Sequence, residues 1–152
     1  MSLDRPPCVA VMLLASFLLL LGSGDLAAQA ATPPDKSCSL FTPGEITKLL
    51  GVPVAAGESA IAGCQWAATT DDSSLAQIQI IEDTSYYEPH KDAEGYQELK
   101  GVGLYGWSGN DFLGWTASAN TGRHVLIVAV NGGTSDRDTA IRFLRMLVQR
   151  VK

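Results

Sequence analysis

Alternation of apolar and polar positions predicts a set of short β-strands. Residues 76–80 (Ala-Gln-Ile-Gln-Ile) alternate strictly, so the two isoleucines share one face and the two glutamines the other. Cys64 and Trp66 share a face in the same way. Residues 126–130 are apolar on both faces, which is typical of a central strand. The predicted strands are 64–67, 76–80, 103–108, 112–118 and 124–130, with polar turns expected at 71–74, 109–111 and 120–122.

Two helices are predicted from their start signals and apolar spacing. The first has Thr42 as its N-cap, Pro43 at the first helical position and Glu45 completing a capping box, and it ends at Gly51. The second is expected to start at an N-cap on Ser135. Its expected buried stripe is Ala140, Ile141, Leu144, Leu147, Val148 and Val151.

A third helix is favoured less strongly within residues 86–100. Ala93, Tyr96 and Leu99 have helical spacing there, but Gly95 interrupts the stripe. Short connections between successive strands favour an antiparallel meander, and the helices then have to cover one face of it. The expected fold is α+β: an antiparallel sheet of about five to six strands with helices packed on one face and one disulfide.

The N-terminus has the pattern of an export signal. Residues 9–21 form an uncharged apolar run, shorter than the roughly 20 residues that span a bilayer. Ala28-Gln29-Ala30 then provides the small residues that a signal peptidase recognises, so cleavage is expected after Ala30. An uncleaved membrane anchor is the alternative. We expect a signal peptide at 1–30, a disordered leader at 31–37 and one domain at 38–152, periplasmic or secreted and without a membrane span after cleavage.

The three cysteines predict one disulfide in that domain. Cys8 is removed with the signal peptide, which leaves Cys38 and Cys64 in an oxidising compartment. Metal binding is the alternative, but two thiols without a CxxC pair or a nearby histidine do not have the ligand spacing of a zinc site. The Cys38–Cys64 disulfide is therefore expected, with no metal and no cofactor.

Net charge excludes one class of partner. The chain has 11 basic and 16 acidic residues, and removing residues 1–30 leaves ten against fourteen. A domain with this excess of acidic residues lacks the basic surface that nucleic acid requires. The expected partners are instead a protein, a peptide or a glycan of the cell envelope.

Several short motifs occur in a recognisable order along the mature chain. They are Cys-Ser-Leu-Phe-Thr-Pro-Gly-Glu-Ile at 38–46, Leu-Leu-Gly at 49–51, Cys-Gln-Trp at 64–66 and Gly-Val-Gly at 101–103. This order resembles a broad group of small exported bacterial domains of unknown function, many of them lipoproteins. Leu104-Tyr105-Gly106 departs from the acidic residue usual in that group, and no cysteine lies directly after the apolar run, since Cys38 is well beyond it. The resemblance implies a disulfide-linked extracytoplasmic domain without a known catalytic constellation, and no membrane tether.

Catalysis has little support in the residue pattern. His90 and His124 are the only histidines, and neither lies in an HExxH or GxSxG setting. No catalytic residue is therefore assigned, and the domain is expected not to be an enzyme. The favoured function is a non-catalytic extracytoplasmic binding module. The alternatives are an inhibitor or immunity-type protein that blocks an exported enzyme, and a divergent hydrolase.

Aromatic residues provide the candidate binding site. Tyr105, Trp107 and Trp115 fall in one predicted hairpin, and Tyr86 and Tyr87 precede it. Tyr105 and Trp107 share a face, and in this hairpin Trp115 could lie across from them. One interpretation is that these rings form the aromatic part of the core. The other is that they form an exposed surface for a partner.

Overall fold

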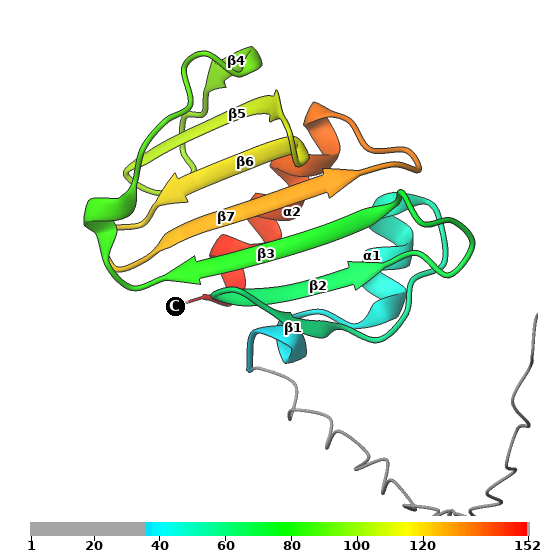
Figure 1. Cartoon of the computed structure of the whole chain (residues 1–152). Helices are drawn as coiled ribbons and strands as arrows, with labels where there is room; N and C mark the ends of the chain where they lie inside the picture. Colours follow the sequence, from blue (N-terminus) through cyan, green and yellow to red (C-terminus); the bar gives the residue numbers. More distant parts are fainter. Residues whose placement is uncertain (1–35, 152) are drawn as a thin grey trace, which may run out of the picture. The chain divides into compact units, whose positions relative to one another are not determined.

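The computed structural model describes residues 36–151, which form one seven-stranded antiparallel sheet with helices (Figure 1). The predicted signal peptide, its cleavage after Ala30 and residues 31–35 of the predicted leader lie outside the described residues. The elements are η1 (Lys36–Leu40), α1 (Pro43–Leu50), β1 (Glu58–Ala60), β2 (Gly63–Ala67), β3 (Leu75–Ile81), η2 (Thr84–Tyr86), β4 (Glu94–Glu98), β5 (Tyr105–Asp111), β6 (Gly114–Asn120), β7 (Val125–Asn131) and α2 (Arg137–Arg150). None of these helices is long and apolar enough to cross a membrane.

The strands lie in the order β1-β2-β3-β7-β6-β5-β4, all neighbours being antiparallel. A single meander was therefore the wrong expectation. Two meanders, β1–β3 and β4–β7, are joined because β3 pairs with β7, with Ile78 opposite Val128. Both strands are rich in β-branched residues and lie in the middle of the sheet, as the apolar pattern of β7 predicted. The α+β class is confirmed, with seven strands rather than five to six because β1 and β4 add short edges.

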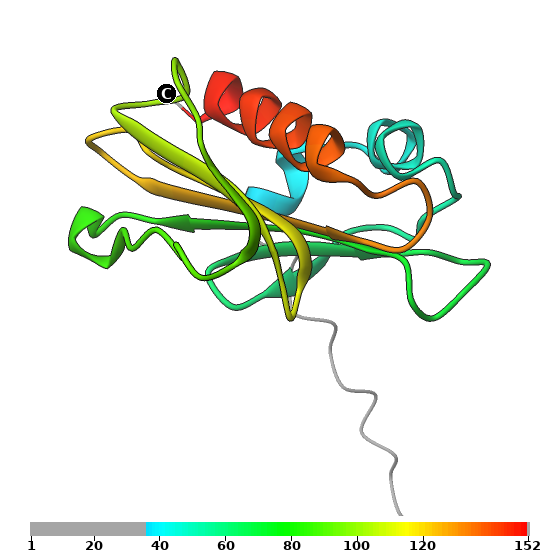
Figure 2. The same ribbon diagram turned by 90° about the horizontal axis from the view of Figure 1, so that it is seen from above.

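Both helices lie on the same side of the sheet (Figure 2). The capping box of α1 is confirmed: the Thr42 side chain accepts from the Glu45 amide, and Gly51 ends the helix at φ 75°. The N-cap of α2 is Asp136 rather than the predicted Ser135, because the Asp136 carboxylate accepts from the Thr139 amide at 2.7 Å.

The main core is packed between the sheet and these helices. Its aromatic centre is Trp66, whose ring meets Phe41 at 6.0 Å and Phe143 at 6.5 Å in edge-to-face contacts. Leu144 and Leu147 of α2 are fully buried against the sheet, as their helical spacing predicted.

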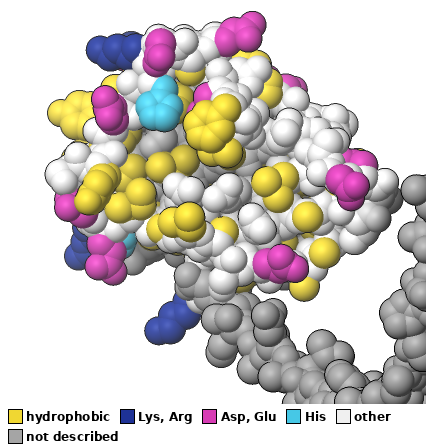
Figure 3. Space-filling model, in the orientation of Figure 1, with side chains coloured by type: hydrophobic (Ala, Val, Ile, Leu, Met, Phe, Trp, Pro, Cys, Tyr) yellow, Lys and Arg dark blue, Asp and Glu magenta, His cyan; other side chains and the backbone are white. Residues whose placement is uncertain are grey.

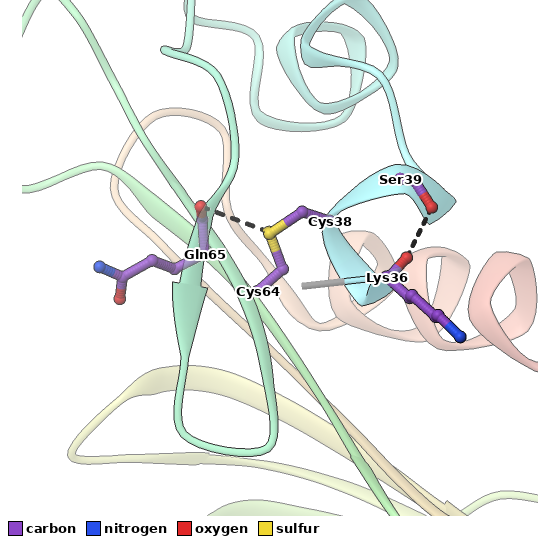
Figure 4. The surroundings of a disulfide bond; sticks show 5 residues. All are labelled: Lys36, Cys38, Ser39, Cys64 and Gln65. Atoms are coloured by element: carbon purple, nitrogen blue, oxygen red, sulfur yellow. Dashed lines mark hydrogen bonds between the residues drawn. A yellow bond between two sulfur atoms is a disulfide. The ribbon is translucent and has the colours of Figure 1, made fainter. Parts of the chain in front are cut away.

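The Cys38–Cys64 disulfide is confirmed and connects η1 to β2, with the two Cα atoms 5.0 Å apart (Figure 4). The indole of Trp66 lies beside the disulfide, as predicted. Both are next to Gly57: a Cβ atom added to this glycine would lie 2.6 Å from Trp66 Nε1 and 2.7 Å from Cys64 Sγ. Lys36 and Ser37 already belong to η1, so regular structure begins before the predicted boundary at Cys38.

The helix expected within 86–100 is absent, and this correction shapes the functional site. The sequence there forms the short η2 and then the edge strand β4. Gly95 has φ +65°, which is incompatible with a continuing α-helix, and the pairing of β4 with β5 shifts register between Glu94 and Gln97. Arg137 Nη2 donates to the Gly95 carbonyl at 2.8 Å and so ties this irregular strand to the start of α2.

Candidate binding pocket on the helix-free face

The face of the sheet opposite the helices is shown in Figure 3, where hydrophobic and acidic side chains lie side by side. A row of paired residues crosses this face from β5 to β3. Trp107 pairs with Ser118, Ser118 with Ile127, and Ile127 with Gln79, so the four side chains point to the same side. Trp107 and Ser118 are buried although no helix covers them.

Residues 82–93 cover this part of the sheet, and we call them the crossing segment. They connect β3 in the middle of the sheet to β4 at its edge, so they have to pass β7, β6 and β5. His90 of this segment lies against the Trp107 ring with centroids 5.0 Å apart, and Tyr96 of β4 stacks on the same ring at 6.2 Å. Trp107 is left only 2% exposed.

A pocket of about 310 Å³ lies between the crossing segment and the sheet. This volume is at the lower end of the range for small-ligand sites. The pocket is lined by Tyr86, Glu88 and His90 from the crossing segment; by Gln79, Trp107, Thr116, Ser118, Val125 and Ile127 from the strands; and by Asp111, Phe112 and Leu113 at the β5–β6 turn.

Two aromatic residues at this pocket are strongly exposed. Phe112 is 89% exposed at the tip of the β5–β6 turn, and Tyr86 is 70% exposed on the crossing segment. A turn tip is normally polar, so an exposed phenylalanine there favours contact with a ligand or partner over a purely structural role.

Asp111 organises the turn and the polar side of the pocket. Its Oδ1 accepts from the Leu113 amide at 2.8 Å and from the Thr116 hydroxyl at 3.1 Å. His90 Nδ1 lies 3.9 Å from Asp111 Oδ2, which is too long for a hydrogen bond. No hydroxyl among residues 36–151 forms a hydrogen bond with His90, so the histidine and the carboxylate do not form a nucleophile–base–acid relay in this arrangement.

The indole N–H of Trp107 is an unsatisfied hydrogen-bond donor. Its Nε1 is buried and has no hydrogen-bond partner within the described part of the chain. A buried donor without an acceptor costs free energy, and this donor belongs to a residue that lines the pocket.

A second, larger hollow of about 530 Å³ lies beside this pocket, at the β4 edge. Tyr87 and Tyr105 face each other there with ring centroids 6.3 Å apart. The pKa of Tyr87 is raised by burial and further by the neighbouring Tyr96 and Glu98. Leu104 and Tyr105 are both about two-thirds exposed, at 67% and 66%.

Four of the five predicted binding residues lie at these two hollows: Tyr86 and Trp107 line the first, and Tyr87 and Tyr105 the second. Trp115 does not join them, and for this residue the core interpretation holds rather than the exposed surface. It pairs with Asn110 and packs against the helix-side core, where the Arg137 guanidinium lies 5.1 Å from its ring. The hairpin turn lies at 112–113 instead of 109–111, and this change of register puts Trp115 on the opposite face.

His90, Asp111 and Phe112 were not among the predicted site residues. The signal for Phe112 and Asp111 was present in Asn-Asp-Phe-Leu-Gly at 110–114, where an acidic turn former precedes an apolar turn. No group of three or more His, Cys, Asp or Glu residues within 36–151 is arranged to hold a metal ion. In comparisons with known proteins, no family model matches the chain, and no curated protein or solved structure is significantly similar to it.

Proposed function

We propose that this protein is a non-catalytic extracytoplasmic binding module whose ligand occupies the pocket beneath the crossing segment. The observation that carries the proposal is the one-sided cover of the sheet. Helices pack on one face, and the other face holds a pocket with a buried, unpartnered indole and two exposed aromatic residues. Concave, largely apolar sites with a few polar groups are the usual form of small-ligand sites.

The extracytoplasmic part of the proposal is supported by the disulfide. Cys38 and Cys64 are bonded and buried, and such bonds persist mainly in oxidising compartments. The expected export signal at 1–30 is consistent with the same location.

The three tryptophans offer a direct test of the pocket. Trp107 lines it, whereas Trp66 lies in the helix-side core and Trp115 packs beside Arg137. We expect binding fragments from a small aromatic library to shift the indole N–H signal of Trp107 in proton–nitrogen NMR spectra while leaving that of Trp66 in place. The same fragments should lose affinity for Phe112→Ala. A library with no hit that moves the Trp107 signal would count against the pocket.

The inhibitor alternative is favoured by a different observation, the exposed pair Leu104 and Tyr105 at the second hollow. An inhibitor should retain one exported enzyme from culture or periplasmic fluid in nearly stoichiometric amount. Replacing both residues by serine should abolish that capture, whereas Ile61→Ser, which removes a still more exposed residue from the β1–β2 turn, should not. Capture that is unaffected by the double change would reject this surface.

A further inference from the structure

Charge is distributed unevenly along the described chain. Residues 82–111, which form the crossing segment, β4 and β5, contain seven acidic and two basic residues, a net charge of −5. The rest of the described chain contains six acidic and seven basic residues, a net charge of +1. The negative potential is therefore concentrated on the elements that build the cover and one side of the pocket, and such a potential attracts cations.

The lining of the pocket is also acidic. Its lining includes the carboxylates of Glu88 and Asp111 but no lysine or arginine. Glu88 has no ion pair or hydrogen bond with any residue of 36–151, and the Oδ2 of Asp111 has only His90 nearby, at 3.9 Å. Asp111 is also well shielded, with a side chain 12% exposed, so its negative charge is only partly screened by solvent.

Aromatic rings surround the same space. Tyr86, Trp107 and Phe112 all line the pocket, and the faces of such rings attract organic cations, most strongly where water is excluded. The combination of aromatic rings and two carboxylates disfavours a carboxylate or phosphate ligand, because the one basic side chain in the lining, His90, already lies 3.9 Å from Asp111.

We infer that the ligand is a small organic cation: an ammonium group joined to an apolar or aromatic body. The ammonium lies between Glu88 and Asp111, and the apolar body lies against Tyr86, Trp107 and Phe112. This inference rests on the proposed function and adds the charge of the ligand to it. A small molecule, rather than a lysine of a protein chain, is favoured by a pocket of about 310 Å³ covered by the crossing segment.

Three probes of similar shape and different charge test the inference: 2-phenylethylammonium, 2-phenylethanol and 3-phenylpropanoate. Affinities are measured from the shift of the Trp107 indole N–H signal at constant ionic strength. The ammonium should bind about tenfold more tightly than the alcohol, because only the ammonium is attracted by the two carboxylates, and the propanoate should not bind measurably. Raising the salt concentration should weaken only the ammonium.

Variants then identify the carboxylates responsible. Glu88→Gln combined with Asp111→Asn should reduce ammonium affinity about tenfold and leave alcohol affinity within about twofold. The matched control is Glu58→Gln combined with Asp72→Asn, which removes the same formal charge outside the pocket. Asparagine at 111 keeps an oxygen acceptor for the Leu113 amide, and a proton–nitrogen spectrum checks that the turn is retained.

Each outcome separates the inference from the proposed function. If the alcohol binds as tightly as the ammonium, or if the control variant weakens the ammonium equally, the charge assignment is wrong and the pocket stands. If no probe moves the Trp107 signal, the pocket itself is rejected. If Nα-acetyl-lysine methylamide binds more tightly than 2-phenylethylammonium, the small-molecule assignment is overturned in favour of a protein lysine.

Discussion

Replacing Trp107 by alanine tests whether the crossing segment holds the pocket together. The indole is 2% exposed and contacts two rings, His90 with a centroid distance of 5.0 Å and Tyr96 at 6.2 Å. Truncating a buried tryptophan to alanine costs about 3–5 kcal/mol, and the loss is smaller where neighbours collapse into the space. Because a connecting segment can move more easily than a core layer, we expect a loss of about 3 kcal/mol in the free energy of unfolding.

The assay is urea unfolding followed by circular dichroism, which does not depend on the tryptophan that is removed. Tyr105→Ala is the matched control: it lies on the same strand and face, is 66% exposed, and should change stability by less than about 0.5 kcal/mol. Trp107→Phe should cost less than the alanine change because it retains a ring and removes an N–H that has no partner. A loss below about 1 kcal/mol for Trp107→Ala would refute the buried arrangement and the pocket built on it.

Three further predictions concern parts of the chain away from the pocket. Replacing both Cys38 and Cys64 by serine should lower the free energy of unfolding by about 3–4 kcal/mol, the loop-closure value for a separation of 26 residues, and two reactive thiols in the native protein would contradict a bonded pair. The hydrogen bonds that Glu45 accepts from Arg150 and from the Thr42 amide lower its pKa from 4.5 to about 2. The contribution of the Glu45 carboxylate to stability is therefore fully present above pH 4.5 and is lost as the pH falls towards 2. The pair is about one-third exposed, so Glu45→Gln should cost about 1 kcal/mol at pH 7 and clearly less near pH 2 in urea melts at the two pH values; a constant difference would contradict this. Signal cleavage after Ala30 predicts an exported protein that starts at residue 31, and its intact mass distinguishes this from another site or an uncleaved chain.

Features with local chemical causes were predictable from the sequence. Thr42 and Glu45 bind each other's backbone within one helical turn, so the start of α1 is encoded in four residues. The alternation at 76–80 identified β3, and the apolar run at 126–130 identified β7 as a central strand. Cys38 and Cys64 were identified as a pair because no other cysteine remains after residue 30.

The features that build the pocket depend on contacts distant in sequence. Nothing near 94–98 indicates a strand, because β4 is defined only by pairing with β5 and is irregular at Gly95. The face of Trp115 depends on where the β5–β6 turn lies, and moving that turn from 109–111 to 112–113 reverses the side on which Trp115 lies relative to Trp107. Predicted elements were therefore mostly right. The exposed-surface interpretation does not hold for the two tryptophans, because Trp107 is buried and Trp115 packs against the helix-side core.

The pocket follows from the topology rather than from any one motif. β3 pairs with β7, so the chain leaving β3 has to pass three strands before it forms β4 at the far edge. The helices already occupy one face, and the connection covers part of the other, where it packs on Trp107. The helix-side core with its disulfide and Trp66 shares no residue with the lining of this pocket. Side chains of the crossing segment can therefore change ligand preference with little effect on that core, since sites without shared partners contribute nearly independently to stability.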